Sequence, residues 1–187
     1  MRQLKLHRRD DHVTTELLLV LQLRAANEPF LPMLESFKCD AVTDEFIPFI
    51  PLYLSPRTTD IDIEFIQCTT AVAVASIITR FPMLCPNLTC ITIWELQRDP
   101  VIIDAASRML LACNPDSLQV FRVDSPLTKE AREVVYRLPK VYKLWAAIEE
   151  HTMLPQLALP NLILIDVEYY DIDWLQGFRG AALEKLK

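Results

Sequence analysis

The sequence predicts an α/β solenoid in which parallel strands line a concave face and helices cover a convex face. Three observations lead to this fold class. An apolar, strand-like pattern recurs every 21 to 30 residues, apolar residues at helical spacing fill the segments between its copies, and a proline precedes most copies. Units of that length hold one strand plus one helix or tight turn, and they bury their apolar faces only by stacking. We therefore expect one domain of irregular repeats over residues 1–187.

Each expected strand follows the pattern apolar-x-x-apolar-x-apolar. The last two apolar positions alternate with outward ones, as a half-buried strand requires. The sets are Leu34/Phe37/Cys39, Thr58/Ile61/Ile63, Leu88/Ile91/Ile93, Leu118/Phe121/Val123, Val141/Leu144/Ala146 and Leu162/Ile165/Val167, with partial copies at Met1/Leu4/Leu6 and Leu183/Leu186. Starts at 34, 58, 88, 118, 141, 162 and 183 give steps of 24, 30, 30, 23, 21 and 21 residues.

Prolines separate each expected helix from the next strand. They stand at Pro32, Pro56, Pro86, Pro115, Pro139 and Pro160, with one extra residue after Pro115. Proline cannot continue a helix, and it biases its neighbour toward an extended conformation. Each proline is therefore expected to end one helix and lead into one strand.

The segments between strands have helical spacing. Asp99 followed by Pro100 is typical of a helix start, and Val101, Ile102, Ala105, Met109 and Leu110 are expected to face inward. Residues 71–81 and 128–138 follow the same pattern, with Ala131, Val134, Val135 and Leu138 facing inward in the second. Pro48 and Pro51 should make 46–54 irregular, and Trp174, Leu175 and Phe178 are expected in a short helical turn.

Composition excludes several classes of function. Net charge is −6, which disfavours nucleic acid as the main ligand, because binding phosphates needs clustered Lys and Arg. The longest apolar run, 71–85, is too short for a membrane span and contains Arg80. Gly177 and Gly180 are the only glycines, so no glycine-rich phosphate loop follows an early strand and a nucleotide-binding α/β domain is disfavoured. The five cysteines are expected to be buried thiols in a reducing compartment.

Catalytic and metal sites have little support in the sequence. No serine-hydrolase or zinc-protease motif occurs, and no cofactor is expected. Asp60, Asp62 and Glu64 alternate along one strand and could hold a cation, but such a row is more often the solvated face of a strand. We therefore expect a binding protein and not an enzyme.

Two segments, L-C-P-N-L-T-C-I-T-I at 84–93 and L-P-N-L-I-L-I-D-V at 159–167, resemble leucine-rich repeats of fungal F-box proteins. The segment V-D-S-P-L-T-K-E-A-R-E-V-V-Y-R-L-P at 123–139 resembles one that recurs in such proteins of mushroom-forming fungi. The resemblance covers residues 80–187 well and the first 80 weakly. It implies that the repeats hold a substrate protein, while an F-box elsewhere in the protein docks on a cullin–RING (SCF) ubiquitin ligase through an adaptor.

The sequence departs from that family in one respect. It contains no Leu-Pro-initiated F-box segment, so adaptor docking is carried over to no residue and is expected only if an F-box lies outside this chain. Both ends are strand-like, and repeat arrays need polar caps, so we expect a fragment or truncated product of a longer protein. Two functions stay open: a substrate-recognition module of a ubiquitin ligase, or a stand-alone repeat scaffold unrelated to ubiquitination. Either would act in the cytoplasm or nucleus.

Partner binding is expected on the face opposite the buried residues. One outward row reads Lys38, Asp62, Thr92, Arg122, Trp145 and Asp166, and a second row, two residues on, reads Asp40, Glu64, Trp94, Asp124, Ala147 and Glu168. Strands about 4.8 Å apart join these rows into one patch. The expected binding residues are Asp62, Glu64, Thr92, Trp94, Arg122, Asp124, Trp145, Asp166 and Glu168. Trp94 and Trp145 are the expected exposed anchors, unless a neighbouring loop covers them, and the acids predict a partner segment of net positive charge.

Overall fold

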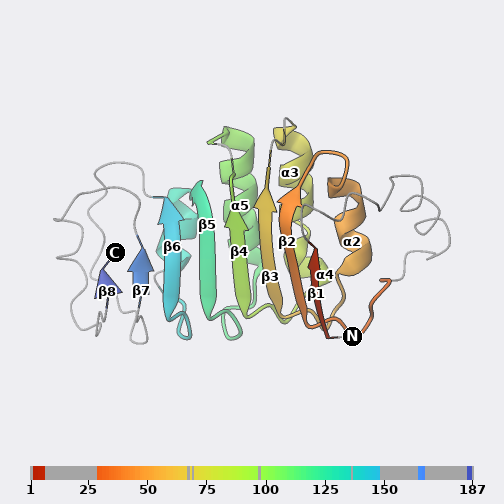
Figure 1. The fold of residues 1–187 in the computed structure, drawn as a ribbon. Helices are drawn as coiled ribbons and strands as arrows, with labels where there is room; N and C mark the ends of the chain where they lie inside the picture. Colours follow the sequence, from red (N-terminus) through yellow and green to blue (C-terminus); the bar gives the residue numbers. More distant parts are fainter. Residues whose placement is uncertain are drawn as a thin grey trace.

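One parallel sheet organises the chain. The computed structural model describes residues 2–6, 29–66, 68, 70–96, 98–135, 137–147, 164–166 and 185–186. Within these ranges, eight strands form a sheet whose order follows the sequence, and every neighbouring pair is parallel (Figure 1). The strands are β1 (Gln3–Leu6), β2 (Ser36–Val42), β3 (Asp60–Phe65), β4 (Cys90–Trp94), β5 (Val120–Pro126), β6 (Lys143–Ala147), β7 (Leu164–Asp166) and β8 (Lys185–Leu186).

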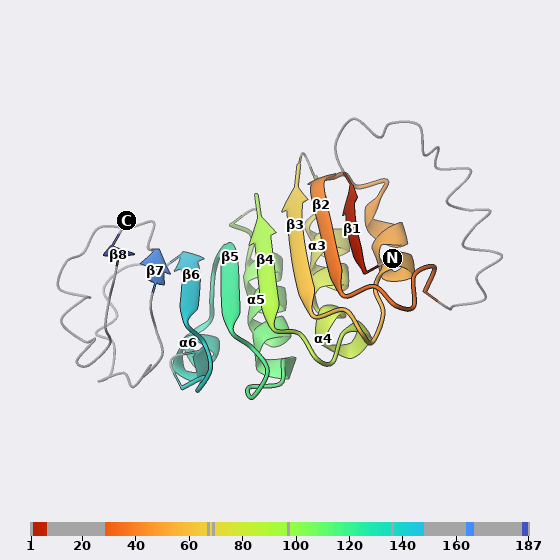
Figure 2. The same cartoon turned by 60° about the horizontal axis from the view of Figure 1, so that its bottom comes forward.

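The helices lie between consecutive strands in the sequence. They are η1 (Ile47–Phe49), α2 (Ile50–Tyr53), α3 (Ala71–Ile78), α4 (Phe81–Leu84), α5 (Pro100–Ala112) and α6 (Lys129–Val135). In both Figure 1 and Figure 2, α3 and α5 lie side by side behind the sheet, on the same face. The prediction of an α/β fold with a parallel sheet is confirmed.

A repeated hydrogen-bond joint connects each strand to the one before it. In each joint one carbonyl accepts two successive backbone N–H groups: Glu35 O accepts from Thr59 and Asp60, and Thr59 O accepts from Thr89 and Cys90. Arg2 O, Thr89 O and Gln119 O do the same for β2, β5 and β6. The first donors, Glu35, Thr59, Thr89, Gln119 and Tyr142, are therefore 24, 30, 30 and 23 residues apart, which are the steps that the apolar pattern predicts.

The core lies between the sheet and the helices. The predicted apolar sets fill it, because alternate strand residues point toward the same side. Leu34, Phe37, Cys39, Thr58, Ile61, Ile63, Leu88, Ile91, Ile93, Leu118, Phe121, Val123, Val141 and Leu144 are all at most 5% exposed. Leu4 and Leu6 are half-buried against this core. The side chains of the sets at 162–167 and 183–186, and that of Ala146, lie outside the described residues.

Helix α5 begins as the sequence predicts. The Asp99 carboxylate accepts a hydrogen bond of 2.8 Å from the Val101 N–H, and Pro100 occupies the first turn. The prediction that Val101 faces inward is wrong, because its side chain is 45% exposed. At helical spacing it lies on the outer side together with Asp104 and Arg108, which form an ion pair of 2.6 Å.

Prolines interrupt the other helical segments. As predicted, the segment with Pro48 and Pro51 is irregular and divides into η1 and α2. The helix expected over 71–81 ends at Ile78, and Pro82 starts the separate helix α4. In α6, Ala131 is buried as predicted, but Val134 lies on the exposed side, one helical position away from the core. The predicted turn at 174–178 lies outside the described residues. None of the helices in the described ranges has the length and hydropathy that a membrane-spanning helix needs.

Candidate binding face

The side of the sheet opposite α3 and α5 carries the polar and aromatic side chains of the strands. In the part of the chain that the structure describes, no helix covers this side (Figures 1 and 2). We call it the helix-free face, formed by Ser36, Lys38 and Asp40 of β2, Asp60, Asp62 and Glu64 of β3, Cys90, Thr92 and Trp94 of β4, Arg122 and Asp124 of β5, and Trp145 of β6. These positions alternate with the buried ones, so the side chains leave the sheet on the other side.

The first predicted row is present in the sheet. Register pairs join Lys38 to Asp62, Asp62 to Thr92, Thr92 to Arg122, Arg122 to Trp145, and Trp145 to Asp166. Equal steps along the sequence bring these six residues side by side, although they span five crossings of the sheet. The register prediction for this row is confirmed, while its role in binding stays a prediction.

The second predicted row is interrupted. Glu64 pairs with Trp94 as expected, but Ala147 pairs with Pro126 and not with Asp124, because the register of β5 shifts after Val123. Proline has no N–H with which to continue a regular ladder. A second shift lies between Cys39 and Val42, next to Asp40. The prediction of one continuous second row is therefore wrong, and Glu168 lies outside the described residues.

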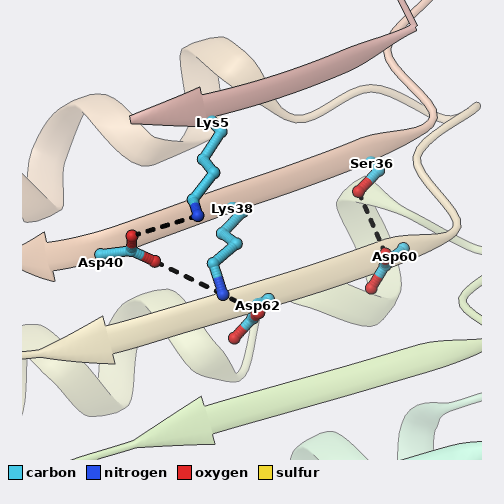
Figure 3. Close-up of polar contacts among 6 residues, drawn as sticks. All are labelled: Lys5, Ser36, Lys38, Asp40, Asp60 and Asp62. Carbon is cyan, nitrogen blue, oxygen red and sulfur yellow. Dashed lines mark hydrogen bonds and ion pairs between the residues drawn. The ribbon is translucent and has the colours of Figure 1, made fainter. Parts of the chain in front are cut away.

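A chain of ion pairs crosses the first three strands of the helix-free face (Figure 3). Lys38 Nζ lies 2.6 Å from Asp62 Oδ2 and 3.5 Å from Asp40 Oδ1, and Lys5 Nζ of β1 lies 3.7 Å from Asp40 Oδ2. The hydrogen bond to Asp62 is the main reason that the pKa of Lys38 is raised. In this part of the face the charges largely neutralise one another.

The three acids considered as a cation site are not gathered around a common centre. Asp62 is bound to Lys38, and Asp60 Oδ2 accepts a hydrogen bond of 3.0 Å from Ser36 Oγ (Figure 3). Within the described ranges, no three His, Cys, Asp or Glu side chains form a group that could hold a metal ion. Asp62 is therefore positioned as a structural partner of the neighbouring strand.

Two tryptophans and an arginine form a second cluster over β4, β5 and β6. The Arg122 Cζ atom lies 4.4 Å from the centre of the Trp94 ring, within the range of a cation–π contact. The Trp94 and Trp145 ring centres are 4.8 Å apart, with the ring planes tilted by 52°. We call these three residues the aromatic cluster.

Burial in this cluster differs from the prediction. Trp145 is only 7% exposed, so the expectation of an exposed ring is wrong for this residue. The backbones of Trp94 and Trp145 belong to strands on either side of β5, roughly 10 Å apart, and the large indole rings lean across β5 toward each other. Trp94 keeps part of its surface and Thr92 is buried. Of the two expected anchors, Trp94 is the one that a partner can reach in this arrangement.

Two charged side chains next to Trp94 have no partner. Glu64 is the register neighbour of Trp94 in β3, and Arg122 stacks on the ring from β5. In the described part of the chain no ion pair joins either residue to another. Arg122 Nε is shielded from solvent and has no hydrogen-bond acceptor. A buried donor without an acceptor is unfavourable, so this guanidinium is not fully satisfied by its own chain.

Asp124 has a local structural role beside the cluster. Its carboxylate accepts hydrogen bonds from the backbone N–H groups of Glu95 and Leu96, the latter at 2.9 Å. Glu95 has a φ of 61°, an uncommon value for a residue other than glycine, and it directly follows Trp94. Asp124 therefore fixes the turn that leaves the aromatic cluster, and its carboxylate is largely used within the chain.

The helix-free face includes residues that the sequence prediction of binding residues omitted. Lys5, Ser36 and Asp60 take part in its polar contacts, and the 24-residue step that aligns Ser36 with Asp60 is the signal that could have found the last two. The contact between Trp94 and Arg122 is diagonal between neighbouring strands. A pattern that compares only register neighbours does not reveal it.

Nucleophilic chemistry by the cysteines is disfavoured. Burial raises the pKa of Cys90, on the helix-free face, to about 12, and it does the same for Cys85 and Cys113. These thiols stay protonated at neutral pH, whereas the thiolate is the reactive form. Cys39, Cys68 and Cys85 are buried free thiols, as predicted.

Comparison with known proteins adds no function to this site. No family model, no curated protein and no solved structure matches this chain. What the protein does must therefore be argued from the helix-free face itself.

Proposed function

We propose that the chain is a leucine-rich-repeat solenoid that binds a partner protein on the helix-free face of its sheet and catalyses no reaction. The observation that carries the proposal is the arrangement of the strands: they follow the sequence order, all are parallel, and α3 and α5 share one side of the sheet. Such stacking leaves the opposite side as a long surface made of equivalent positions, which is how repeat proteins bind large partners.

The side chains on this face suit recognition of a protein. Protein interfaces are enriched in tryptophan and arginine, and binding energy concentrates where these residues are surrounded by contacts that exclude water. Trp94 and Arg122 lie together on the face, with the buried Trp145 and Thr92 beside them. The acids of β2 and β3 lie on one side of this cluster.

The resemblance of 84–93, 123–139 and 159–167 to repeats of fungal F-box proteins supports a more specific proposal. By this analogy the chain is the substrate-recognition part of a component of a cullin–RING (SCF) ubiquitin ligase. The alternative is a stand-alone repeat scaffold unrelated to ubiquitination. Purification of the complete gene product from its native cell discriminates between them. Recovery of the ligase adaptor with it favours the first function, and absence of the adaptor favours the second.

Binding on the helix-free face can be tested with defined probes. A displayed library of random 12-residue peptides is selected on the immobilised 187-residue chain, and the selected peptides are then measured against variants. Trp94→Ala should weaken binding by about 2 kcal/mol or more if Trp94 is an anchor. Met83→Ala is the matched control, because Met83 is a large exposed apolar residue on α4, away from this face.

The outcomes are distinct. Selected peptides that lose affinity for Trp94→Ala but keep it for Met83→Ala support the proposal, provided that both variants melt at the temperature of the parent. Peptides that bind Trp94→Ala as strongly as the parent place the binding surface elsewhere and contradict it. A selection that enriches no peptide also counts against it.

A further inference from the structure

The charges around Trp94 point to the kind of segment that the helix-free face would recognise. Glu64 on one side and Arg122 on the other have opposite signs, and neither has an ion-pair partner in the described residues. The other charges nearby are engaged: Lys38 holds Asp40 and Asp62, and Asp124 holds two backbone N–H groups. The face therefore presents one available negative and one available positive group, with an indole ring between them.

The geometry explains why these two charges do not neutralise each other. Glu64 belongs to β3 and Arg122 to β5, so two strand spacings, about 9.6 Å, separate their backbones. Trp94 of β4 lies between them, and its ring takes the face of the guanidinium. An ion pair across the ring would have to break the stacking contact.

Stacking also sets how Arg122 can be bound. A guanidinium that rests with one face on an aromatic ring keeps its N–H groups directed outward in its own plane, where a carboxylate binds with two parallel hydrogen bonds. The Nε donor, one of the five N–H groups of the guanidinium, has no acceptor in the chain. A carboxylate supplied by a partner would give this group the acceptor that it lacks.

We infer that the helix-free face binds a partner segment that carries opposite charges at its two ends, with an acidic side chain on Arg122, a basic side chain on Glu64 and an apolar group over Trp94. The inference rests on the proposed function. It refines the prediction of a simply basic partner, because the positive group at Arg122 disfavours a segment that is basic throughout.

The spacing between the two charges limits the length of the segment. A polyproline II helix rises about 3.1 Å per residue and repeats every three residues, so its residues i and i+3 point the same way about 9.3 Å apart. This distance is close to the two strand spacings that separate Glu64 from Arg122. An extended segment with a base and an acid three residues apart fits the face.

The experiment uses charge reversals on the full 187-residue chain. The same random 12-residue library is selected separately on the parent, on Arg122→Glu and on Glu64→Lys. The matched controls are Arg80→Glu and Glu133→Lys, which make the same charge changes at exposed positions on the helix side. Arg122→Gln is included as a milder change, and far-ultraviolet circular dichroism and thermal melting establish that each variant folds.

We expect peptides selected on the parent to contain an acid and a base about three residues apart. Such peptides should bind Arg122→Glu and Arg122→Gln at least about tenfold more weakly than the parent, because their acid loses its partner. Selection on Arg122→Glu should favour a base in place of that acid, selection on Glu64→Lys should favour an acid in place of the base, and the controls should match the parent.

Two results overturn the inference, and they differ in what they say about the proposed function. If the parent's peptides depend on Trp94 but show no charge preference that switches with Arg122→Glu, the face binds proteins and the dipolar motif is wrong. If no peptide depends on Trp94 at all, the proposed function fails and the inference fails with it.

Discussion

Replacing Ile91 by alanine tests the central part of the fold. Ile91 lies in the middle of β4, its register neighbours are Ile61 and Phe121, and its side chain is 0% exposed. The change removes three buried carbon atoms, which at about 0.8 kcal/mol each lowers the free energy of unfolding by about 2.4 kcal/mol. The cavity that remains adds to this loss, because neighbours on both sides are fixed in the sheet, so we expect about 3 to 4 kcal/mol.

Urea unfolding followed by circular dichroism measures this loss, with Val101→Ala as the control. Val101 is expected to face inward from the sequence, but it lies on the outer side of α5, so its truncation should cost less than about 1 kcal/mol. A loss below about 1 kcal/mol for Ile91→Ala would refute the enclosure of β4 between its neighbours. Equal losses for the two variants would refute the orientation of α5.

Three further predictions concern the polar groups and the thiols. Asp99→Ala should lower the free energy of unfolding by about 1 kcal/mol in a urea titration, because the first turn of α5 loses its cap, and an unchanged midpoint would contradict the cap. Lys38→Met should cost no more than about 1 kcal/mol, because Lys38 and Asp62 are both partly solvated, and the loss should shrink in about 1 M salt; a loss that salt leaves unchanged would show that screening is unimportant. The pKa of Cys85 and of Cys113 is raised from 9.0 to about 12, so a disulfide reagent should label neither thiol at pH 8 until urea unfolds the chain. Because only the unfolded state loses these protons between pH 9 and 12, stability should fall as the pH rises through that range.

The strands and their core could be predicted because they depend on local alternation. Each of Phe37, Ile61, Ile91 and Phe121 stands one residue from a polar or outward residue, and a parallel strand that is half-buried needs that pattern. The equal steps then fixed which outward residues become neighbours, from Lys38 to Trp145. No contact between distant segments had to be known in advance.

The details of the candidate site depend on such contacts. The register shift after Val123 and the use of Asp124 as a cap for the turn at Glu95 arise from packing between neighbouring strands and loops. The way in which Trp94 and Trp145 lean across β5 is a choice of side-chain rotamers, which strand alternation does not determine. Sequence patterns located the face, but could not tell which of its charges already have partners.

The paired hydrogen bonds at each joint have a consequence for how this molecule can change. The unit from Glu35 to Thr59 contains η1 and α2, while the longer unit from Thr59 to Thr89 contains α3 and α4, yet both begin with the same joint. Extra residues are therefore accommodated on the helix side, while the strands keep their spacing. Insertions and deletions between strands can alter the back of the molecule and leave the ruling of the opposite surface unchanged. A surface of this kind can evolve new specificity one side chain at a time, independently of changes in chain length.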